Sequence, residues 1–134
     1  ENSVFYDSYM QKDCSIKANT SSRIEGIGRP KCELSFQPDV INQMMRVPDA
    51  ASIATIHWLE KQIGRKAGAS TGTNLWGALK VAEDMMQNNQ QGSIVTLMCD
   101  SGNRYLDTYY DLQWVENKIG DISAFQTQLD KWVK

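Results

Sequence analysis

The most constraining feature of the sequence is a short apolar run at residues 94–98, Ile-Val-Thr-Leu-Met, which lies between Gly92 and Gly102. Its β-branched residues and short length favour a strand covered on both faces, as parallel strands between helices are. The run leads directly into a turn-like Cys-Asp-Ser-Gly stretch at residues 99–102. Ligands of open α/β sheets bind at the carboxyl ends of strands, so Ser101 is the first candidate for a ligand contact. A serine that only caps its own turn would fit the same pattern.

Composition places the chain among ordinary globular proteins. Its 134 residues are 41% hydrophobic and 22% charged, with a formal net charge of -2. A single segment, residues 1–134, of one domain's size is therefore expected. The weak negative charge and the lack of a Lys/Arg block argue against nucleic-acid binding. No apolar run approaches the ~18 residues needed to cross a membrane, and the polar opening at residues 1–3 shows no secretory pattern.

Cysteine and histidine usage disfavours a metal centre. Cys14, Cys32 and Cys99 are odd in number, widely spaced and without a C-x-x-C pair. Neither a disulfide framework nor a zinc site is indicated by that pattern. The single histidine, His57, lies beside an apolar helical stripe, which favours a packed or surface role over that of a general base. We therefore expect no metal and a reducing, cytoplasmic location.

Two strong helical patterns precede the apolar run. The first extends from Asp49 to Gly64, and the second follows the loop at residues 68–74. Apolar residues at spacings of three and four give each a core-facing stripe: Ile53, Ile56, Leu59 and Ile63 in the first, and Leu75, Leu79, Ala82 and Met86 in the second. Shorter helices are expected at residues 111–118 and 123–134. Two strand-like segments, residues 94–98 and a brief one around residues 44–47, predict an α/β fold together with these helices.

Two glycine-containing loops are candidate ligand contacts. Residues 23–30, Arg-Ile-Glu-Gly-Ile-Gly-Arg-Pro, make a poor helix and would let a flat ligand approach the main chain, although an ordinary turn also explains them. Residues 68–74, Gly-Ala-Ser-Thr-Gly-Thr-Asn, open into the second helix, where free N–H groups and the helix dipole favour an anion. This is not a Walker A loop, because no Lys-Ser/Thr pair follows. Simple capping by Ser70 or Thr71 is the alternative.

Taken together, three motifs resemble the cysteine synthase family of fold-type II pyridoxal-phosphate enzymes, also called the tryptophan synthase β group. The motifs are Glu25-Gly-Ile-Gly28, Gly68-Ala-Ser-Thr-Gly-Thr-Asn74 and Ser101-Gly-Asn-Arg-Tyr-Leu-Asp-Thr108. The similarity covers roughly residues 1–120, and variants within it are similar to a branch of cysteine synthase-like proteins and cysteine desulfhydrases. The resemblance implies an α/β three-layer parallel-sheet sandwich, of which this chain is the C-terminal part of the large domain.

The resemblance also implies roles for individual residues. Ser101 would hydrogen-bond the pyridine nitrogen of pyridoxal 5'-phosphate, and its neutral hydroxyl does not compel that nitrogen to stay protonated, as a carboxylate would. Its place in the motif assigns this contact to Ser101 and not to Asp100. The remaining expected contacts are Gly26, Ile27 and Gly28 for the cofactor, and Ser70, Thr71 and Gly72 for the substrate cleft.

Part of such an enzyme is not found in these residues. The family's Schiff-base lysine lies in a Ser-x-Lys motif well upstream, as do the loop that binds the cofactor phosphate and the asparagine that contacts its ring hydroxyl. We expect the chain to be the C-terminal portion of a two-domain enzyme and to be inactive alone. Its expected partners are the missing N-terminal half, a second copy in a homodimer, an amino-acid substrate and sulfide. The parent enzyme, a lyase or transferase, would carry out β-elimination or β-replacement on cysteine or O-activated serine, as in cysteine biosynthesis.

Two other classes of protein stay open. A non-catalytic binding or regulatory module would keep this half of the fold and hold a peptide or a small anion in the cleft. An unrelated α/β domain would contain the three motifs by accident. In that case Ser101→Ala would change little beyond local stability.

Overall fold

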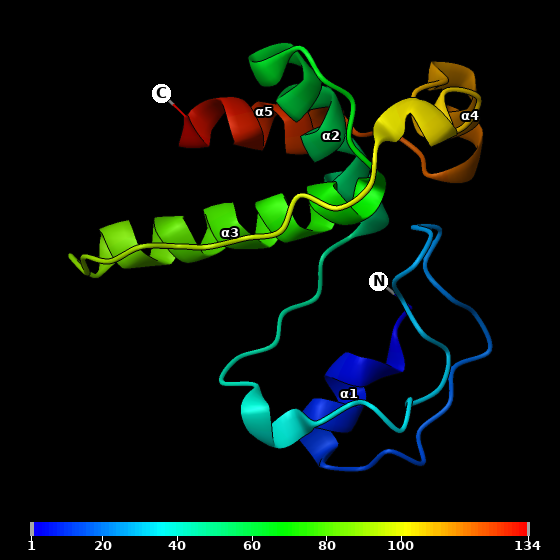
Figure 1. Ribbon diagram of the computed structural model, residues 1–134, viewed down its shortest axis with the longest axis vertical. Coiled ribbons are helices and arrows are strands. Elements are labelled where there is room, and N and C mark those ends of the chain that lie inside the picture. The colour runs from blue at the N-terminus through cyan, green and yellow to red at the C-terminus, as the bar shows by residue number, and fades with distance from the viewer. Residues whose placement is uncertain (1, 134) are drawn as a thin grey trace. The chain divides into compact units, whose positions relative to one another are not determined.

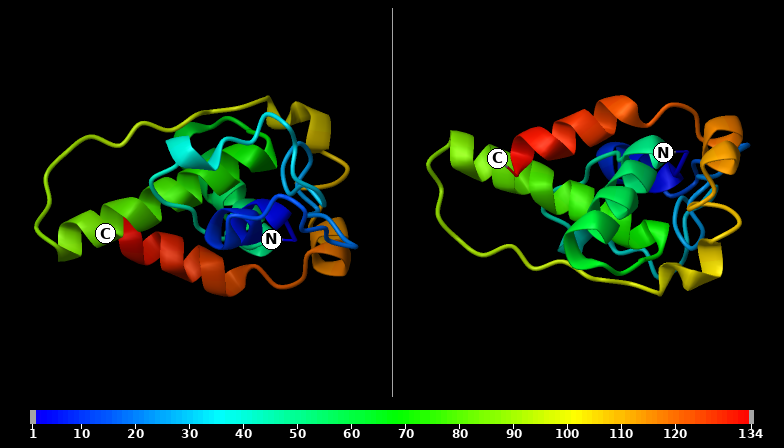
Figure 2. Two further views of the ribbon diagram at one scale, coloured as in Figure 1. Left: turned by 90° about the horizontal axis from the view of Figure 1, so that it is seen from below. Right: turned by 90° about the horizontal axis from the view of Figure 1, so that it is seen from above.

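The computed structural model describes residues 2–133 (Figures 1 and 2). The chain divides into two compact units, Glu1–Arg46 and Val47–Lys134, and each is described by itself. The helices of the first unit are α1 (Val4–Gln11) and the short 3-10 helix η1 (Pro38–Val40). The helices of the second unit are α2 (Asp49–Ile63), α3 (Ala69–Gln87), the 3-10 helix η2 (Gly102–Tyr105), α4 (Leu112–Lys118) and α5 (Ser123–Trp132). Within residues 2–133, no helix is both long and apolar enough to span a membrane.

The first unit is organised around α1. Ser3 caps this helix, because its hydroxyl accepts a hydrogen bond from the N–H of Phe5 at 3.4 Å. The ring of Phe5 stacks on that of Phe36, with 4.6 Å between the ring centroids. The hydroxyl of Tyr9 donates to the carbonyl of Ile41 at 3.2 Å. These contacts tie the segment around η1 to α1.

Helix α2 confirms the helix that the first apolar stripe predicts. Pro48 occupies the N-cap position with extended backbone, and Gly64 ends the helix in the left-handed conformation, with a φ of 66°. Glycine adopts that conformation at low cost, which explains the sharp stop. Ile53 and Ile56 are completely buried, whereas Ile63 at the end of the stripe is exposed. The N-terminal half of α2 is therefore the part that contributes to the core.

Helix α2 packs against both α3 and α5 (Figure 1). The close approach to α3 falls at Gly72, where a Cβ atom would lie only 2.0 Å from the carbonyl oxygen of Ser52. On α3, the ring of Trp76 contacts the rings of Phe125 and Trp132 of α5, at centroid distances of 5.5 Å and 4.7 Å. Aromatic packing of this kind fixes helices by area and by ring geometry.

Helix α3 begins earlier than the sequence predicts. Gly68 is its N-cap residue, so Ser70, Thr71 and Gly72 lie in the first turn of the helix and not in an open loop. Gly72 looks like a helix breaker in the sequence, but the closeness of α2 requires a residue without a side chain at that position. The glycine is therefore explained by packing between two helices.

The buried strand expected at residues 94–98 is wrong for the described chain. Residues 90–99 form no regular secondary structure, and Figure 2 shows this segment standing away from the helices. Val95 is 92% exposed and Leu97 is 72% exposed. A strand needs neighbours that pair its N–H and C=O groups, and residues 2–133 offer only two isolated bridges and no other strand. The described residues alone therefore do not build the three-layer sheet sandwich.

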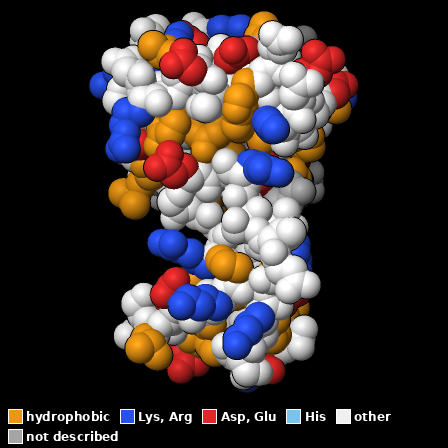
Figure 3. Space-filling model, turned by 90° about the vertical axis from the view of Figure 1, so that its right-hand side faces the viewer, with side chains coloured by type: hydrophobic (Ala, Val, Ile, Leu, Met, Phe, Trp, Pro, Cys, Tyr) orange, Lys and Arg blue, Asp and Glu red, His pale blue; other side chains and the backbone are white. Residues whose placement is uncertain are grey.

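The second unit also shows apolar side chains at its surface. Figure 3 shows them between charged side chains on the visible face of this unit. The exposed apolar residues of the whole unit include Val95 and Leu97 of the extended segment, and Met86 of a stripe that the sequence predicts as core. Exposed apolar surface of this kind is typical of a face that another part of a protein covers.

Candidate functional site

The residues that follow the extended segment are anchored beside the start of α3. The N–H of Gly68 donates to the carbonyl of Asp100 at 2.9 Å, and the N–H of Gly102 donates to the carbonyl of Lys66 at 3.1 Å. These two bonds flank an antiparallel bridge between Ala67 and Ser101. The glycine-rich stretch and the Ser101 stretch therefore meet in one place, although they lie about thirty residues apart in the sequence. Their backbones pair there as two short antiparallel strands would.

Two glycines make this close approach possible. A Cβ atom at Gly102 would lie 2.6 Å from Cβ of Lys66 and 2.7 Å from the backbone nitrogen of Ala67. A Cβ atom at Gly68 would lie 2.0 Å from Oδ1 of Asp100. Neither position can carry a side chain without displacing its neighbour. The two glycines therefore allow the two stretches to come close enough to form the bridge between Ala67 and Ser101.

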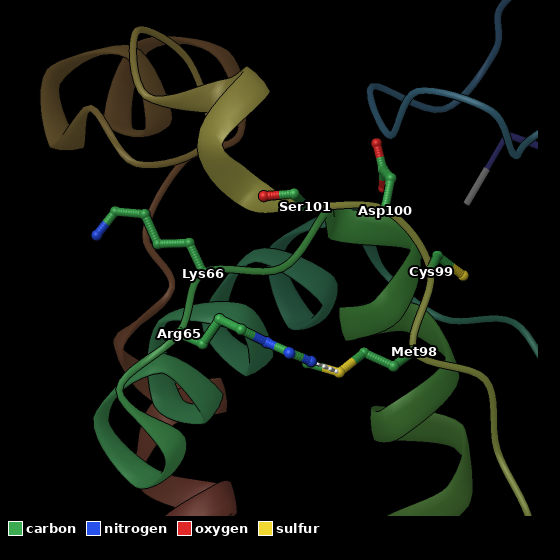
Figure 4. A pocket seen from close by; sticks show the side chains of 6 residues that line it. All are labelled: Arg65, Lys66, Met98, Cys99, Asp100 and Ser101. Atoms are coloured by element: carbon green, nitrogen blue, oxygen red, sulfur yellow. Dashed lines mark hydrogen bonds between the residues drawn. The ribbon is translucent and has the colours of Figure 1, made fainter.

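Ser101 lies at the edge of an open pocket. The pocket has a volume of about 330 Å³ and is lined by Arg65, Lys66, Met98, Cys99, Asp100 and Ser101 (Figure 4). The Ser101 hydroxyl is exposed and accepts a hydrogen bond from the N–H of Asn103 at 3.3 Å, which caps η2. Ser101 therefore does cap its own turn, as one of the two interpretations of the sequence expects. A hydroxyl has one proton and two lone pairs, so capping leaves the proton of Ser101 available to a ligand.

The neighbouring carboxylate is engaged elsewhere. The hydroxyl of Tyr105, a buried residue, donates to Oδ2 of Asp100 at 2.7 Å. Figure 4 shows the Asp100 carboxylate and the Ser101 hydroxyl pointing to different sides of the segment. The geometry therefore separates the two side chains, and the hydroxyl is the one that lies on the same side as Lys66.

The cationic side chains of the pocket have partners of their own. Lys66 forms an ion pair with Glu60, and its ammonium lies 4.8 Å from the centre of the Tyr110 ring. Arg65 donates to Sδ of Met98 at 2.7 Å. The hydroxyl of Tyr110 donates to the carbonyl of Ala67 at 2.8 Å, and burial raises the pKa of Tyr110. Both cations of the pocket wall thus have partners: Glu60 and the Tyr110 ring for Lys66, and the sulfur of Met98 for Arg65.

The predicted cleft residues have distinct positions in α3. Thr71 is buried, and its hydroxyl accepts a hydrogen bond from the N–H of Cys99 at 2.8 Å. Gly72 faces α2, and Ser70 is half-buried. Thr71 therefore positions the segment that leads to Ser101, while Ser70 is the member of the three with an accessible side chain.

The predicted cofactor loop lies in the first unit. Gly26 and Gly28 both have left-handed backbone, with φ values of 85° and 74°. A Cβ atom at Gly28 would lie 2.2 Å from Cβ of Ser22, whereas a Cβ atom at Gly26 would meet nothing within 4 Å. Ile27 between them is exposed. Gly26 thus presents open main chain, and Gly28 is required by the turn itself.

His57 is a structural residue, as the sequence indicates. Its Nε2 atom lies 2.7 Å from the carbonyl oxygen of Tyr109, so this nitrogen carries the proton and donates. The bond ties α2 to the turn that follows η2. Within residues 2–133, no three His, Cys, Asp or Glu residues cluster as metal ligands would.

The sequence is similar to several curated proteins that are named for cysteine chemistry. It is 51% identical over 115 residues to L-cysteine desulfhydrase Cds1 of Mycobacterium tuberculosis, which covers 86% of this chain and 31% of that protein. It is 30% identical over 129 residues to cysteine synthase 1 of Emericella nidulans, with coverage of 94% and 34%. A putative pyridoxal-phosphate dependent protein of Caenorhabditis elegans is 38% identical over 102 residues, with coverage of 69% and 22%. No family model matches the chain.

The chain belongs to the cysteine synthase-like family. The resemblance that the three motifs carry is thereby confirmed. The chain spans about a third of the length of the first two of these relatives, which is 31% and 34% of their residues. Most of such a relative therefore has no counterpart in these 134 residues.

The letters of the family's Ser-x-Lys motif do occur once in the chain, at Ser15-Ile16-Lys17. They lie outside the three motifs of the family, and Lys17 is an exposed residue whose backbone pairs with Lys31. Desolvation and a fixed position activate a catalytic lysine. The exposed side chain of Lys17 lacks that desolvation, so Lys17 is a poor candidate for that role.

Proposed function

We propose that this chain is the C-terminal part of a pyridoxal-phosphate-dependent enzyme of the cysteine synthase-like family. The whole protein would catalyse β-elimination or β-replacement on cysteine or O-activated serine, in sulfur amino-acid metabolism. The observation that carries the proposal is the 51% identity to an L-cysteine desulfhydrase over 86% of this chain. Identity at that level over most of a chain supports a shared fold and a shared chemistry.

The chemistry of Ser101 fits the ring nitrogen of the cofactor. Its hydroxyl is exposed at the pocket, and its acceptor side takes the N–H of Asn103, which leaves the proton free to donate to a pyridine nitrogen. Asp100 would instead favour a protonated ring nitrogen, but its carboxylate accepts the hydroxyl of Tyr105. A neutral partner suits a restrained electron sink, which is what elimination or replacement at a β-carbon requires.

The bound cofactor would accept negative charge from the α-carbon of the substrate. The residues of this chain would hold and orient the reacting molecules. Thr71 fixes the backbone that carries Ser101, through its bond to the N–H of Cys99. Gly26 offers open main chain on which a flat ring would lie, and Ser70 has the accessible hydroxyl at the start of α3.

The rest of the enzyme would supply the lysine, the phosphate-binding loop and the asparagine that contacts the ring. It would also supply neighbours for residues 94–98, which would then form a strand of the three-layer parallel sheet. The exposure of Val95 and Leu97 supports this, because residues two apart share one face of a strand, and a layer packed on that face of the sheet would cover both side chains. The isolated chain would be inactive, and the complete enzyme would be a homodimer.

The test is the visible absorption spectrum and the sulfide release of the full-length protein with cysteine. We expect a visible band from lysine-bound cofactor that borohydride removes. Ser101→Ala should shift that band and lower kcat/KM by about tenfold, because one hydrogen bond to the ring is lost. Lys17→Ala is the matched control and should change neither, since an exposed lysine is not the residue that binds the cofactor.

A Ser101→Ala protein with an unchanged spectrum and rate would contradict the assignment of the ring-nitrogen contact. A wild-type protein with no visible band, even after incubation with pyridoxal phosphate, would contradict the enzyme proposal and favour the binding module. Addition of sulfide and O-acetylserine, followed by assay of cysteine, separates β-replacement from β-elimination.

A further inference from the structure

Two cysteines that are far apart in the sequence meet in the first unit. The Sγ atoms of Cys14 and Cys32 lie 2.6 Å apart, and both residues are free thiols. The S–S bond of a disulfide is about 2.05 Å long, so closing this bond needs an approach of only about half an ångström. Cys99, the third cysteine, lies in the second unit, where Asn74 contacts its sulfur.

Backbone contacts hold the two thiols together. Lys17 and Lys31 form an antiparallel bridge that brings the two stretches side by side. Just before the bridge, the carboxylate of Asp13 accepts the N–H of Ser15 at 2.8 Å, which turns the chain and directs the cysteine between them toward its partner. The Asp13 turn and the Lys17–Lys31 bridge thus hold the two sulfur atoms close together without a rearrangement of the backbone.

Both thiols are within reach of small molecules. Cys14 is exposed and Cys32 is half-buried. Contact with the Cys32 thiol raises the pKa of Cys14. Reaction is expected to accelerate as the pH rises, because the thiolate is the nucleophile.

We propose that Cys14 and Cys32 form a reversible disulfide when the protein meets a low-molecular-weight disulfide. The thiolate of one cysteine attacks a sulfur of the small disulfide, which forms a mixed disulfide and releases one small thiol. The other cysteine, after losing its proton, attacks the protein-bound sulfur, closes the Cys14–Cys32 bond and releases the second small thiol. The protein loses two electrons and two protons, and the small disulfide gains them as two thiols.

The bond would close a ring that contains Gly26 and Gly28. A closed ring has fewer conformations than an open loop, so the segment between the cysteines would become stiffer. This consequence rests on the proposed function, in which these glycines lie against the cofactor. Oxidation would then restrict the mobility of the cofactor loop, and reduction would restore it.

The test is peptide mapping of the full-length protein. Reduced protein is equilibrated with oxidised glutathione, alkylated with iodoacetamide and digested with trypsin. Trypsin cleaves after Lys12, Lys17, Lys31 and Arg46. The bond therefore joins peptide 13–17 to peptide 32–46, and we expect this linked pair to exceed the glutathione adducts of either peptide and to vanish on reduction.

Single serine variants provide the controls. Cys99→Ser should leave the linked pair unchanged, because Cys99 belongs to the other unit. Cys14→Ser and Cys32→Ser should both lose it and should accumulate a stable glutathione adduct on the cysteine that is left. Separate adducts on both cysteines of the wild-type protein, without the linked pair, would overturn the proposal.

The consequence for the loop has its own readout. Under native conditions, brief trypsin treatment should cut after Arg23, between the two cysteines, several-fold more slowly in the oxidised protein than in the reduced protein. Equal rates would refute the stiffening, whereas the linked pair alone decides the disulfide. Neither measurement requires bound cofactor or turnover, so failure of the enzyme proposal leaves both intact.

Discussion

Replacing Gly72 by alanine should force α2 and α3 apart. The new Cβ atom would lie 2.0 Å from the carbonyl oxygen of Ser52 and 2.9 Å from Cγ2 of Ile56, where ordinary contacts begin at 3.4 Å. The oxygen belongs to the backbone of a helix and cannot rotate away. Overpacking typically costs about 1–3 kcal/mol, and this overlap is severe, so ~3 kcal/mol is expected. Alanine recovers about 1 kcal/mol of helix propensity, which leaves a net loss of about 2 kcal/mol in the free energy of unfolding.

Urea unfolding followed by tryptophan fluorescence measures this loss. All four tryptophans lie at residues 58, 76, 114 and 132, so the signal reports on the second unit. Gly92→Ala is the matched control, because its Cβ atom would meet only the flexible end of Met85, at 3.1 Å, and should change stability by less than about 0.5 kcal/mol. A Gly72→Ala protein as stable as the wild type would refute the close helix contact.

Two further predictions concern the second unit. Asp111→Ala should lower the free energy of unfolding by about 1 kcal/mol, because the carboxylate caps α4 by accepting the N–H groups of Gln113 and Trp114 at 2.8 Å and 3.1 Å. Asp111→Asn should retain most of the wild-type stability, since an asparagine side chain also caps a helix. Equal urea midpoints for the two variants would contradict the cap. Burial raises the pKa of Tyr110, so the folded protein favours the neutral phenol. The stabilisation from this phenol is complete below the unfolded-state pKa of ~10 and is lost as the pH rises through the pKa of the folded state. Urea unfolding from about pH 8 to about pH 11 should show this fall, and Tyr110→Phe should make it shallower; identical slopes would exclude Tyr110 as the cause.

The helices could be predicted because their causes are local. Apolar spacing, a proline or acid at the start and a glycine at the stop place α2 correctly, and Gly64 adopts the expected left-handed backbone. The capping reading of Ser101 was likewise available from its turn, and the structure contains that cap. Helix stops and caps depend on residues close in sequence, so they can be predicted without knowing which other parts of the protein lie nearby.

The features that depend on distant partners were missed. Residues 94–98 have the composition of a buried strand, but a strand is defined by its neighbours, and residues 2–133 provide none. Gly72 reads as a loop glycine because the backbone of Ser52 that excludes a side chain is far away in the sequence. The meeting of Cys14 and Cys32 has no spacing signature, since a turn and a single bridge create it.

The extended segment also bears on how the chain behaves in solution. Residues 93–98, Ser-Ile-Val-Thr-Leu-Met, have no charge, no proline and no glycine, and they combine high β-propensity with exposed apolar side chains. Six-residue windows of this composition stack readily into intermolecular cross-β assemblies when nothing covers them. We therefore expect this segment to promote aggregation of the isolated 134-residue chain, and Val95→Lys, at a position that is 92% exposed, to suppress it. We therefore expect the solubility of these 134 residues alone to depend on this exposed segment more than on the small net charge of -2.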